Sequence, residues 1–218
     1  MNLYNLNELF EVNNELEFDL ITETWGNYIH VKDFFKFPSN IIQYIKNSPC
    51  IKTPNFYEEI NGKYYFDGRS HIIFPHLPRF SEVCFHLMKT NFHLNTNVGL
   101  KFDNPFMVIC NHFKLYNNKF NKYKTHNFCP HVDGNNTIAC IWYFNENYSS
   151  DEGTGIYDKV NTNAENPWSN KEKLLGKVPA IYNNLIIYRG DIPHAQIVTD
   201  RWINETRISM VQFFTLNN

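Results

Sequence analysis

The chain has 218 residues, of which 43% are hydrophobic and 19% are charged, and its formal net charge is −2. This composition is typical of a globular domain with enough residues to bury a core, and it excludes an extended disordered chain. No cluster of Lys and Arg indicates a nucleic-acid-binding surface, and no apolar run has the length of a membrane span.

The cysteines and the first residues bear on the compartment. The 5 cysteines form no CxxC pair and no even framework, which predicts free thiols in a reducing environment. The opening sequence MNLYNLNELF lacks the basic start and the apolar segment of a signal peptide. We therefore expect a cytoplasmic protein.

The first part of the chain, residues 1–95, mixes short strands and helices. An alternating, β-branched pattern over residues 27–35 predicts a strand. Residues 38–48 begin with Pro-Ser and place three isoleucines on one helical face, which predicts a helix. A second helix is expected over residues 79–92, with Ser81 as its N-cap.

From about residue 99, short strand-like runs separated by turn signals replace this pattern. They are GLKFDNPFMVICNHFKLY, FCPHVDG, TIACIWYFN, GTGIYD, NNLIIYRGD, AQIVTD and RISMVQFFTL. Many short strands at this spacing predict a sandwich or barrel-like double sheet, and the preceding helices could cover one face of it. We expect one domain, residues 1–218, with a buttress at 1–95 and a β core at 96–218. The insert at 159–179, which contains Trp168, is expected to be a solvated loop or a lid.

One candidate ligand pair stands at the start of a strand, in the stretch CPHVDGNNTIACIWYFN. His131 and Asp133 are two residues apart, so in a strand both side chains point to the same face. They would present a nitrogen and an oxygen ligand side by side. With 9 His in the chain, chance gives roughly 0.4 such pairs, so the pair alone decides little.

A second imidazole follows downstream, where a Gly-Asp turn leads through Pro193 to His194 and a new strand. In a jelly roll, the strands that lie between Asp133 and His194 can return the chain beside the first pair. Two His and one carboxylate on one side of a metal leave positions open on the other, as in non-haem Fe(II) sites. Taken by itself, His194 fits equally well a loop imidazole bonded to a backbone carbonyl.

The last strand-like run carries a candidate anion anchor. Arg207 and Ser209 share one face of that strand. A guanidinium binds a carboxylate through two hydrogen bonds, and a neighbouring hydroxyl adds another. This pair would hold the far carboxylate of a dicarboxylic keto acid that chelates the metal. Arg201 is the rival, but its context TDRWINET is typical of a turn, and Arg207 itself also fits an edge-strand ion pair.

The order HVD, PH and RIS resembles the Fe(II)/2-oxoglutarate-dependent oxygenase superfamily, in its prolyl-hydroxylase-like branch. The stretch IHVKDFFKFPSNIIQYI is similar to the opening of small bacterial and viral members. The resemblance covers residues 28–216 and implies a double-stranded β-helix (jelly roll) with N-terminal helices packed on one sheet. A departure is the order Gly153-Thr154-Gly155, where many members have Gly-Gly-x-Thr. If the protein is viral, the cytoplasm would be that of the host.

The resemblance also implies roles for residues. His131, Asp133 and His194 become the iron ligands, and Arg207 with Ser209 becomes the 2-oxoglutarate anchor. A tyrosine often touches the co-substrate in such enzymes, and of Tyr116, Tyr123 and Tyr143 we favour Tyr123. The implied activity is hydroxylation of an unactivated C–H bond with release of succinate and CO2. Halogenation is disfavoured because relatives that halogenate lack the carboxylate that Asp133 supplies.

Cofactors and partners follow from the same resemblance. We expect Fe(II), 2-oxoglutarate as co-substrate and, as a further candidate, ascorbate. The expected substrate is a small molecule or a peptide, with an amino-acid or peptidyl side chain as the target, and neither nucleic acid nor membrane is an expected partner. The oligomeric state stays open.

Two alternatives to this interpretation stay open. Cys129 has the same strand parity as His131 and Asp133, so these residues could bind zinc together with His194. A non-catalytic, cupin-like module could also hold a metal without redox turnover. Charge-transfer colour on addition of Fe(II) and 2-oxoglutarate without oxygen would be specific to the oxygenase.

Overall fold

The structure is a computed structural model of the whole chain. It describes residues 5–47, 51–52, 58–59, 62–63, 69–73, 79–92, 100–101, 107–113, 127–128, 130–147, 149, 151–161, 168–169, 172–197, 199, 201, 205 and 207–216. Within these residues, no helix is long and apolar enough to cross a membrane.

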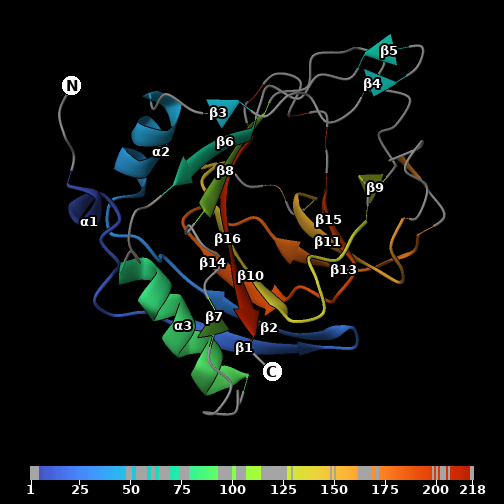
Figure 1. Ribbon diagram of the computed structural model, residues 1–218, viewed down its shortest axis with the longest axis horizontal. Helices are drawn as coiled ribbons and strands as arrows, with labels where there is room; N and C mark the ends of the chain where they lie inside the picture. Colours follow the sequence, from blue (N-terminus) through green and yellow to red (C-terminus); the bar gives the residue numbers. More distant parts are fainter. Residues whose placement is uncertain are drawn as a thin grey trace.

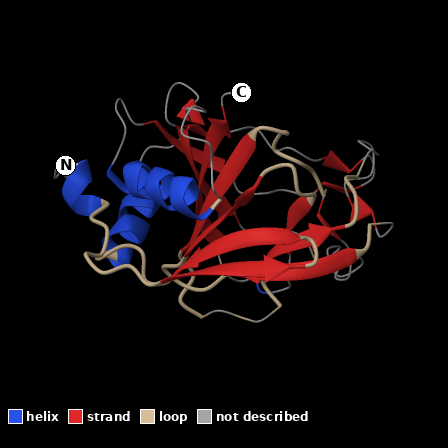
Figure 2. Ribbon diagram, turned by 90° about the horizontal axis from the view of Figure 1, so that it is seen from below, coloured by secondary structure: helices blue, strands red, loops and turns tan. Residues whose placement is uncertain are grey.

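Helices cover one side of the molecule. They are α1 (Leu6–Leu9), α2 (Pro38–Asn47) and α3 (Arg79–Asn91). The isoleucines of α2 are buried together, as the spacing predicted. Figure 2 shows the helices together on one side of the strands, so the expected helical cover on one sheet face is confirmed.

A large antiparallel sheet forms the centre of the structure (Figure 1). Its strands, in spatial order, are β1 (Phe18–Glu23), β2 (Gly26–Val31), β14 (Leu185–Arg189), β10 (Thr137–Tyr143), β16 (Arg207–Leu216), β8 (Met107–Phe113), β6 (Arg69–Ile73) and β3 (Ile51–Lys52), and β7 (Leu100–Lys101) also pairs with β16. Strands far apart in sequence are therefore neighbours, and β10 lies between β14 and β16.

A second, smaller sheet faces the large one. It contains β13 (Leu174–Pro179), β11 (Gly153–Tyr157) and β15 (His194–Ile197), and a bridge between His131 and His194 adds one more segment at its edge. Two short pairs complete the described strands: β4 (Glu58–Glu59) with β5 (Gly62–Lys63), and β9 (Asn127–Phe128) with β12 (Trp168–Ser169).

The chain passes back and forth between the two sheets. It runs from β8 in the large sheet to His131 in the small one, then to β10, to β11 and β13, to β14, to β15 and finally to β16. This alternation of antiparallel strands between two facing sheets is a double-stranded β-helix, or jelly roll. The predicted mainly β fold with an N-terminal helical layer is confirmed.

Alternation along the strands divides the interior into two cores. On β10, Cys140 and Trp142 face the helices, whereas Ala139, Ile141 and Tyr143 face the small sheet. Side chains of a strand point alternately to opposite faces, so a sheet buried on both sides needs an almost continuous apolar run. The sequence TIACIWY meets this requirement.

Three details differ from the sequence-based expectations. Residues 18–23 form β1, which pairs with β2 through a tight hairpin although its exposed positions give no clear apolar alternation. Ser81 does not cap α3; it lies inside the first turn, buried, and its hydroxyl donates a hydrogen bond to Gln212 Oε1 at 2.7 Å. The insert at 159–179 ends in β13, a strand of the small sheet, so this part is not a loop.

The helix-side core generates the first prediction. Phe35 is 1% exposed, and its ring lies 5.8 Å from Phe80 and 5.9 Å from Trp142. Phe35→Ala would leave a cavity between helices and sheet, so we expect the free energy of unfolding to fall by about 3–5 kcal/mol. Phe37→Ala is the matched control, because Phe37 is 42% exposed, and it should cost at most about 0.5 kcal/mol. Urea unfolding measures both, and equal losses would contradict this packing.

Candidate metal centre

His131 and His194 are held side by side by their backbones. The His131 N–H donates to the His194 carbonyl at 2.9 Å, and the His194 N–H donates back to the His131 carbonyl at 2.9 Å. Residues that exchange both hydrogen bonds are directly opposite in an antiparallel pair, so their side chains project on the same face. The two imidazole centroids are 4.7 Å apart.

Asp133 is placed by the turn that precedes β10. Its N–H donates to the Gly190 carbonyl at 2.7 Å, which ties it to the turn before His194. Gly134 has φ +136°, a conformation that side chains other than glycine rarely adopt, and it redirects the chain into β10. A Cβ on Gly190 would lie 3.0 Å from Asp133 Cβ, so a glycine there lets the two turns approach closely.

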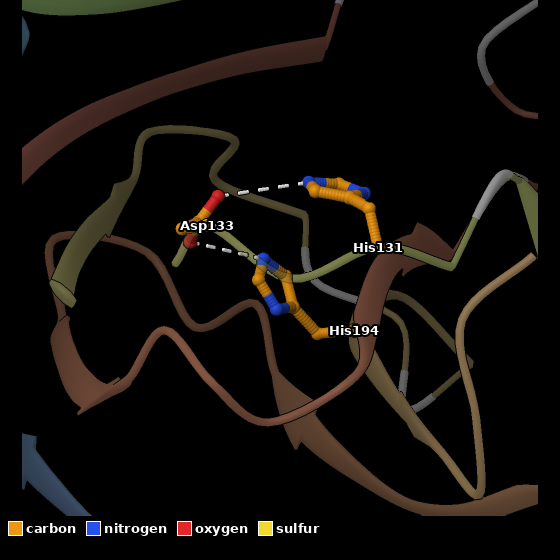
Figure 3. A group of neighbouring side chains, drawn as sticks. All are labelled: His131, Asp133 and His194. Atoms are coloured by element: carbon orange, nitrogen blue, oxygen red, sulfur yellow. Dashed lines mark ion pairs between the residues drawn. The ribbon is translucent and has the colours of Figure 1, made fainter. Parts of the chain in front are cut away.

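The three side chains converge on one point (Figure 3). Asp133 Oδ1 lies 3.7 Å from His131 Nε2, and Asp133 Oδ2 lies 3.3 Å from His194 Nε2. One nitrogen or oxygen of each residue falls within a common span of 4.8 Å. The structure thus brings together the three residues that the sequence singled out as candidate ligands.

The ring of His194 is oriented for ligation. Its Nδ1 lies 2.8 Å from the Ile192 carbonyl, which can only accept, so Nδ1 carries the proton and Nε2 keeps a lone pair. The Tyr188 ring packs edge-on against it, with centroids 5.0 Å apart. A second hydrogen bond that fixes the tautomer is typical of metal-ligating histidines.

The donor atoms fit a divalent metal. Asp133 Oδ2 is buried and accepts no hydrogen bond from the described residues, which is costly for a carboxylate unless a cation compensates. Two imidazole nitrogens and one carboxylate oxygen suit Fe(II) with open positions. The third partner of the zinc alternative, Cys129, lies outside the described residues.

The cluster is open on one side. The His131 side chain is 52% exposed, whereas those of Asp133 and His194 are 12% and 7% exposed. Val132, between the two ligand candidates of the first pair, is 39% exposed. A small molecule can therefore reach the cluster from the side of His131 and Val132.

Arg207 and Ser209 lie inside the jelly roll. They are 5% and 1% exposed, and the guanidinium donates to Ser209 Oγ at 2.8 Å. Arg207 and Ser209 have the same strand parity as Val211, which packs in the core between the sheets, and the guanidinium lies 5.8 Å from the Tyr143 ring centroid. The rival reading of Arg207 as an exposed edge-strand ion pair does not fit this burial.

Arg201 is engaged elsewhere. It donates to Glu152 Oε2 at 3.0 Å and to Glu205 Oε2 at 2.8 Å, and it also bonds the Asn147 carbonyl. It lines a groove of about 410 Å³ beside α2, and no member of the His131–Asp133–His194 cluster lines this groove. Arg201 therefore stabilises the end of the fold that precedes β16.

The tyrosine candidates separate clearly. Tyr116 and Tyr123 lie outside the described residues, so the preference for Tyr123 stays a prediction. Tyr143 is buried beside Arg207, and its hydroxyl is hydrogen-bonded to Thr154 Oγ1 at 2.7 Å. Burial raises the pKa of Tyr143, and the nearby Arg207 charge opposes the rise.

Sequence reasoning missed Tyr188. This residue lies on β14 and is fully buried in the core between the sheets. Burial raises its pKa strongly, the Asp133 carboxylate raises it further, and Arg207 acts in the opposite direction. Its parity with Ile186, on the strand that leads to His194, was the available signal.

Comparisons with known proteins address the fold. No protein-family model matches the sequence, and no curated protein matches it either. The structure is similar to a non-haem α-ketoglutarate-dependent epimerase, SnoN from nogalamycin biosynthesis, with TM-score 0.48, 10% identity, and 86% of this chain and 78% of that chain covered.

Two further solved structures are similar at the same level. An oxidoreductase of the 2OG-Fe(II) oxygenase family from Burkholderia pseudomallei has TM-score 0.45 and 10% identity over 86% of this chain and 84% of that chain. A Pseudomonas putida prolyl-4-hydroxylase has TM-score 0.35 and 11% identity over 82% of this chain and 98% of that chain. At these identities the likeness concerns the arrangement of strands.

The geometry predicts a metal-binding site that depends on Asp133. Asp133→Ala removes the shared carboxylate, so Co(II) affinity measured by isothermal titration calorimetry should fall by more than the roughly 10–100-fold typical of an outer-sphere change. Asp191→Ala is the matched control: its carboxylate belongs to the neighbouring turn and pairs with Arg189 at 2.8 Å. Equal affinities of the two variants would refute the site.

A second prediction concerns the close approach of the two turns. Gly190→Ala would press a methyl group against Asp133 Cβ and Thr137 Cβ, each 3.0 Å away. We expect the carboxylate to shift and Co(II) binding to weaken roughly 10-fold while all three ligand residues remain. The same titration measures it, and an unchanged affinity would show that the turn tolerates the side chain.

Proposed function

We propose that the protein is an Fe(II)- and 2-oxoglutarate-dependent oxygenase that hydroxylates an unactivated C–H bond. One observation carries the proposal: an open cluster of two imidazoles and one carboxylate lies in the same jelly roll as a buried arginine that faces the inter-sheet core. The cluster supplies a place for the metal, and the arginine supplies a place for the second carboxylate of the keto acid.

His131, Asp133 and His194 would hold the metal through Nε2, a carboxylate oxygen and Nε2. These three ligands leave the other coordination positions to co-substrate and oxygen. Bound Fe(II), with 2-oxoglutarate and O2, supplies the oxidising chemistry, which releases succinate and CO2. The protein keeps the ligands in place through the backbone pair between His131 and His194 and the Ile192 carbonyl.

Arg207 would bind the far carboxylate of 2-oxoglutarate. A buried guanidinium binds an anion strongly because little water competes for it. The Ser209 hydroxyl already accepts one hydrogen bond from Arg207, and its own proton remains available for the anion. The Tyr143 ring supports the guanidinium from one side.

The substrate would approach from the exposed side of the cluster. His131 and the apolar Val132 border that side. An apolar edge beside a metal site suits an aliphatic C–H bond of an amino-acid or peptidyl side chain, which is the substrate class that we propose. The described residues offer no support for ascorbate as a further cofactor.

A test of this function starts with the protein, Fe(II) and 2-oxoglutarate under anaerobic conditions. Chelation by the keto acid should give a visible charge-transfer band, and admission of oxygen with a panel of amino acids and peptides should give succinate. A module that only stores metal would bind Fe(II) without the band and without succinate. The absence of both would exclude the oxygenase.

The anchor can be tested separately. Arg207→Ala removes a charge-assisted contact that is worth about 1.5–3 kcal/mol, so the apparent KM for 2-oxoglutarate should rise about 10- to 100-fold. Arg201→Ala leaves the inter-sheet interior unchanged and should leave this KM within about twofold. The reverse outcome would assign the anchor to Arg201.

A further inference from the structure

The Tyr188 side chain carries a buried hydroxyl that has no hydrogen-bond partner among the described residues. Tyr188 is 0% exposed, so water does not replace the missing partner. A buried hydroxyl is usually paired, because removing it from water without a new hydrogen bond is unfavourable. An unpaired one in a candidate site indicates a ligand that supplies the acceptor.

The position of Tyr188 indicates which ligand. Its ring packs edge-on against His194 with a centroid separation of 5.0 Å, so it borders the candidate metal centre. Asp133 and Arg207 both lie within electrostatic range of the Tyr188 hydroxyl. Tyr188 therefore stands between the metal end and the anchor end of the proposed co-substrate site.

Tyr143 provides an internal comparison. It faces the same core and also lies near Arg207, but its hydroxyl already has Thr154 Oγ1 as a partner at 2.7 Å. Tyr143 thus needs no ligand to complete its hydrogen bonding. Of these two interior tyrosines, Tyr188 is the one whose donor is still available.

We propose that the Tyr188 hydroxyl donates a hydrogen bond to the 2-oxo acid bound between the metal centre and Arg207. The acceptor would be a carboxylate oxygen of that ligand, and the neutral phenol adds a donor without adding charge. This makes Tyr188 a co-substrate-binding residue. The inference rests on the proposed function and adds a residue to it that the sequence did not reveal.

Binding measurements test this without turnover. In the Fe(II)-loaded protein under anaerobic conditions, Tyr188→Phe keeps the ring against His194 and removes only the donor. The Kd for 2-oxoglutarate should rise roughly 10-fold, whereas the Kd for Fe(II) should stay within twofold of the wild-type value. Both constants come from calorimetry, and the charge-transfer band gives an independent titration.

Tyr28→Phe is the matched control. Tyr28 lies directly opposite Tyr188 on the neighbouring strand β2 and belongs to the same core, but its ring stacks on Trp25 at 5.5 Å. We expect its 2-oxoglutarate Kd to equal that of the wild type. A structural role for the Tyr188 hydroxyl would lower the melting temperature of the ligand-free variant, whereas an unpaired donor predicts no loss.

The outcomes separate the two claims. If the wild-type protein with Fe(II) binds no 2-oxoglutarate, the proposed function fails and this inference fails with it. If the wild type binds it and Tyr188→Phe binds it equally well, only the role of Tyr188 is refuted. A weaker Kd that is confined to Tyr188→Phe, with unchanged stability and iron affinity, supports the assignment.

Discussion

The reciprocal backbone hydrogen bonds between His131 and His194 are the constraint on which the site depends. They join two segments that are far apart in the sequence and fix which faces their side chains share. Because these bonds use main-chain atoms, the pairing does not require particular side chains at either position. The chain was therefore free to place two imidazoles at this bridge, and the Asp133–Gly190 hydrogen bond brings the carboxylate to them.

The jelly roll gives this bridge its surroundings. On the helix side, aromatic residues fill a dry core that stabilises the large sheet. Between the sheets, the core is apolar at Ile141 and Ile186 but turns polar towards Arg207 and Ser209. Buried polar groups are unfavourable unless they are paired. Their presence at one end of an otherwise apolar interior makes chemical sense if a charged ligand completes them.

The sequence predicted the local features well and the long-range ones poorly. Strand parity placed His131 with Asp133 and Arg207 with Ser209, because parity depends only on backbone geometry. The pairing of β1 with β2, the strand at residues 174–179 and the burial of Ser81 against Gln212 depend on tertiary contacts that no local pattern encodes. Tyr188 was missed for the same reason: a buried aromatic on a central strand resembles any core residue until its neighbours are known.

The coordination of the bound metal tests the central claim most directly. X-ray absorption spectroscopy on the Fe(II)-loaded protein reports the number and type of ligand atoms. The account predicts a six-coordinate ion with two imidazoles, otherwise oxygen ligands, and loss of one imidazole in His194→Ala. A four-coordinate ion with a sulfur ligand, or a spectrum that His194→Ala leaves unchanged, would contradict it.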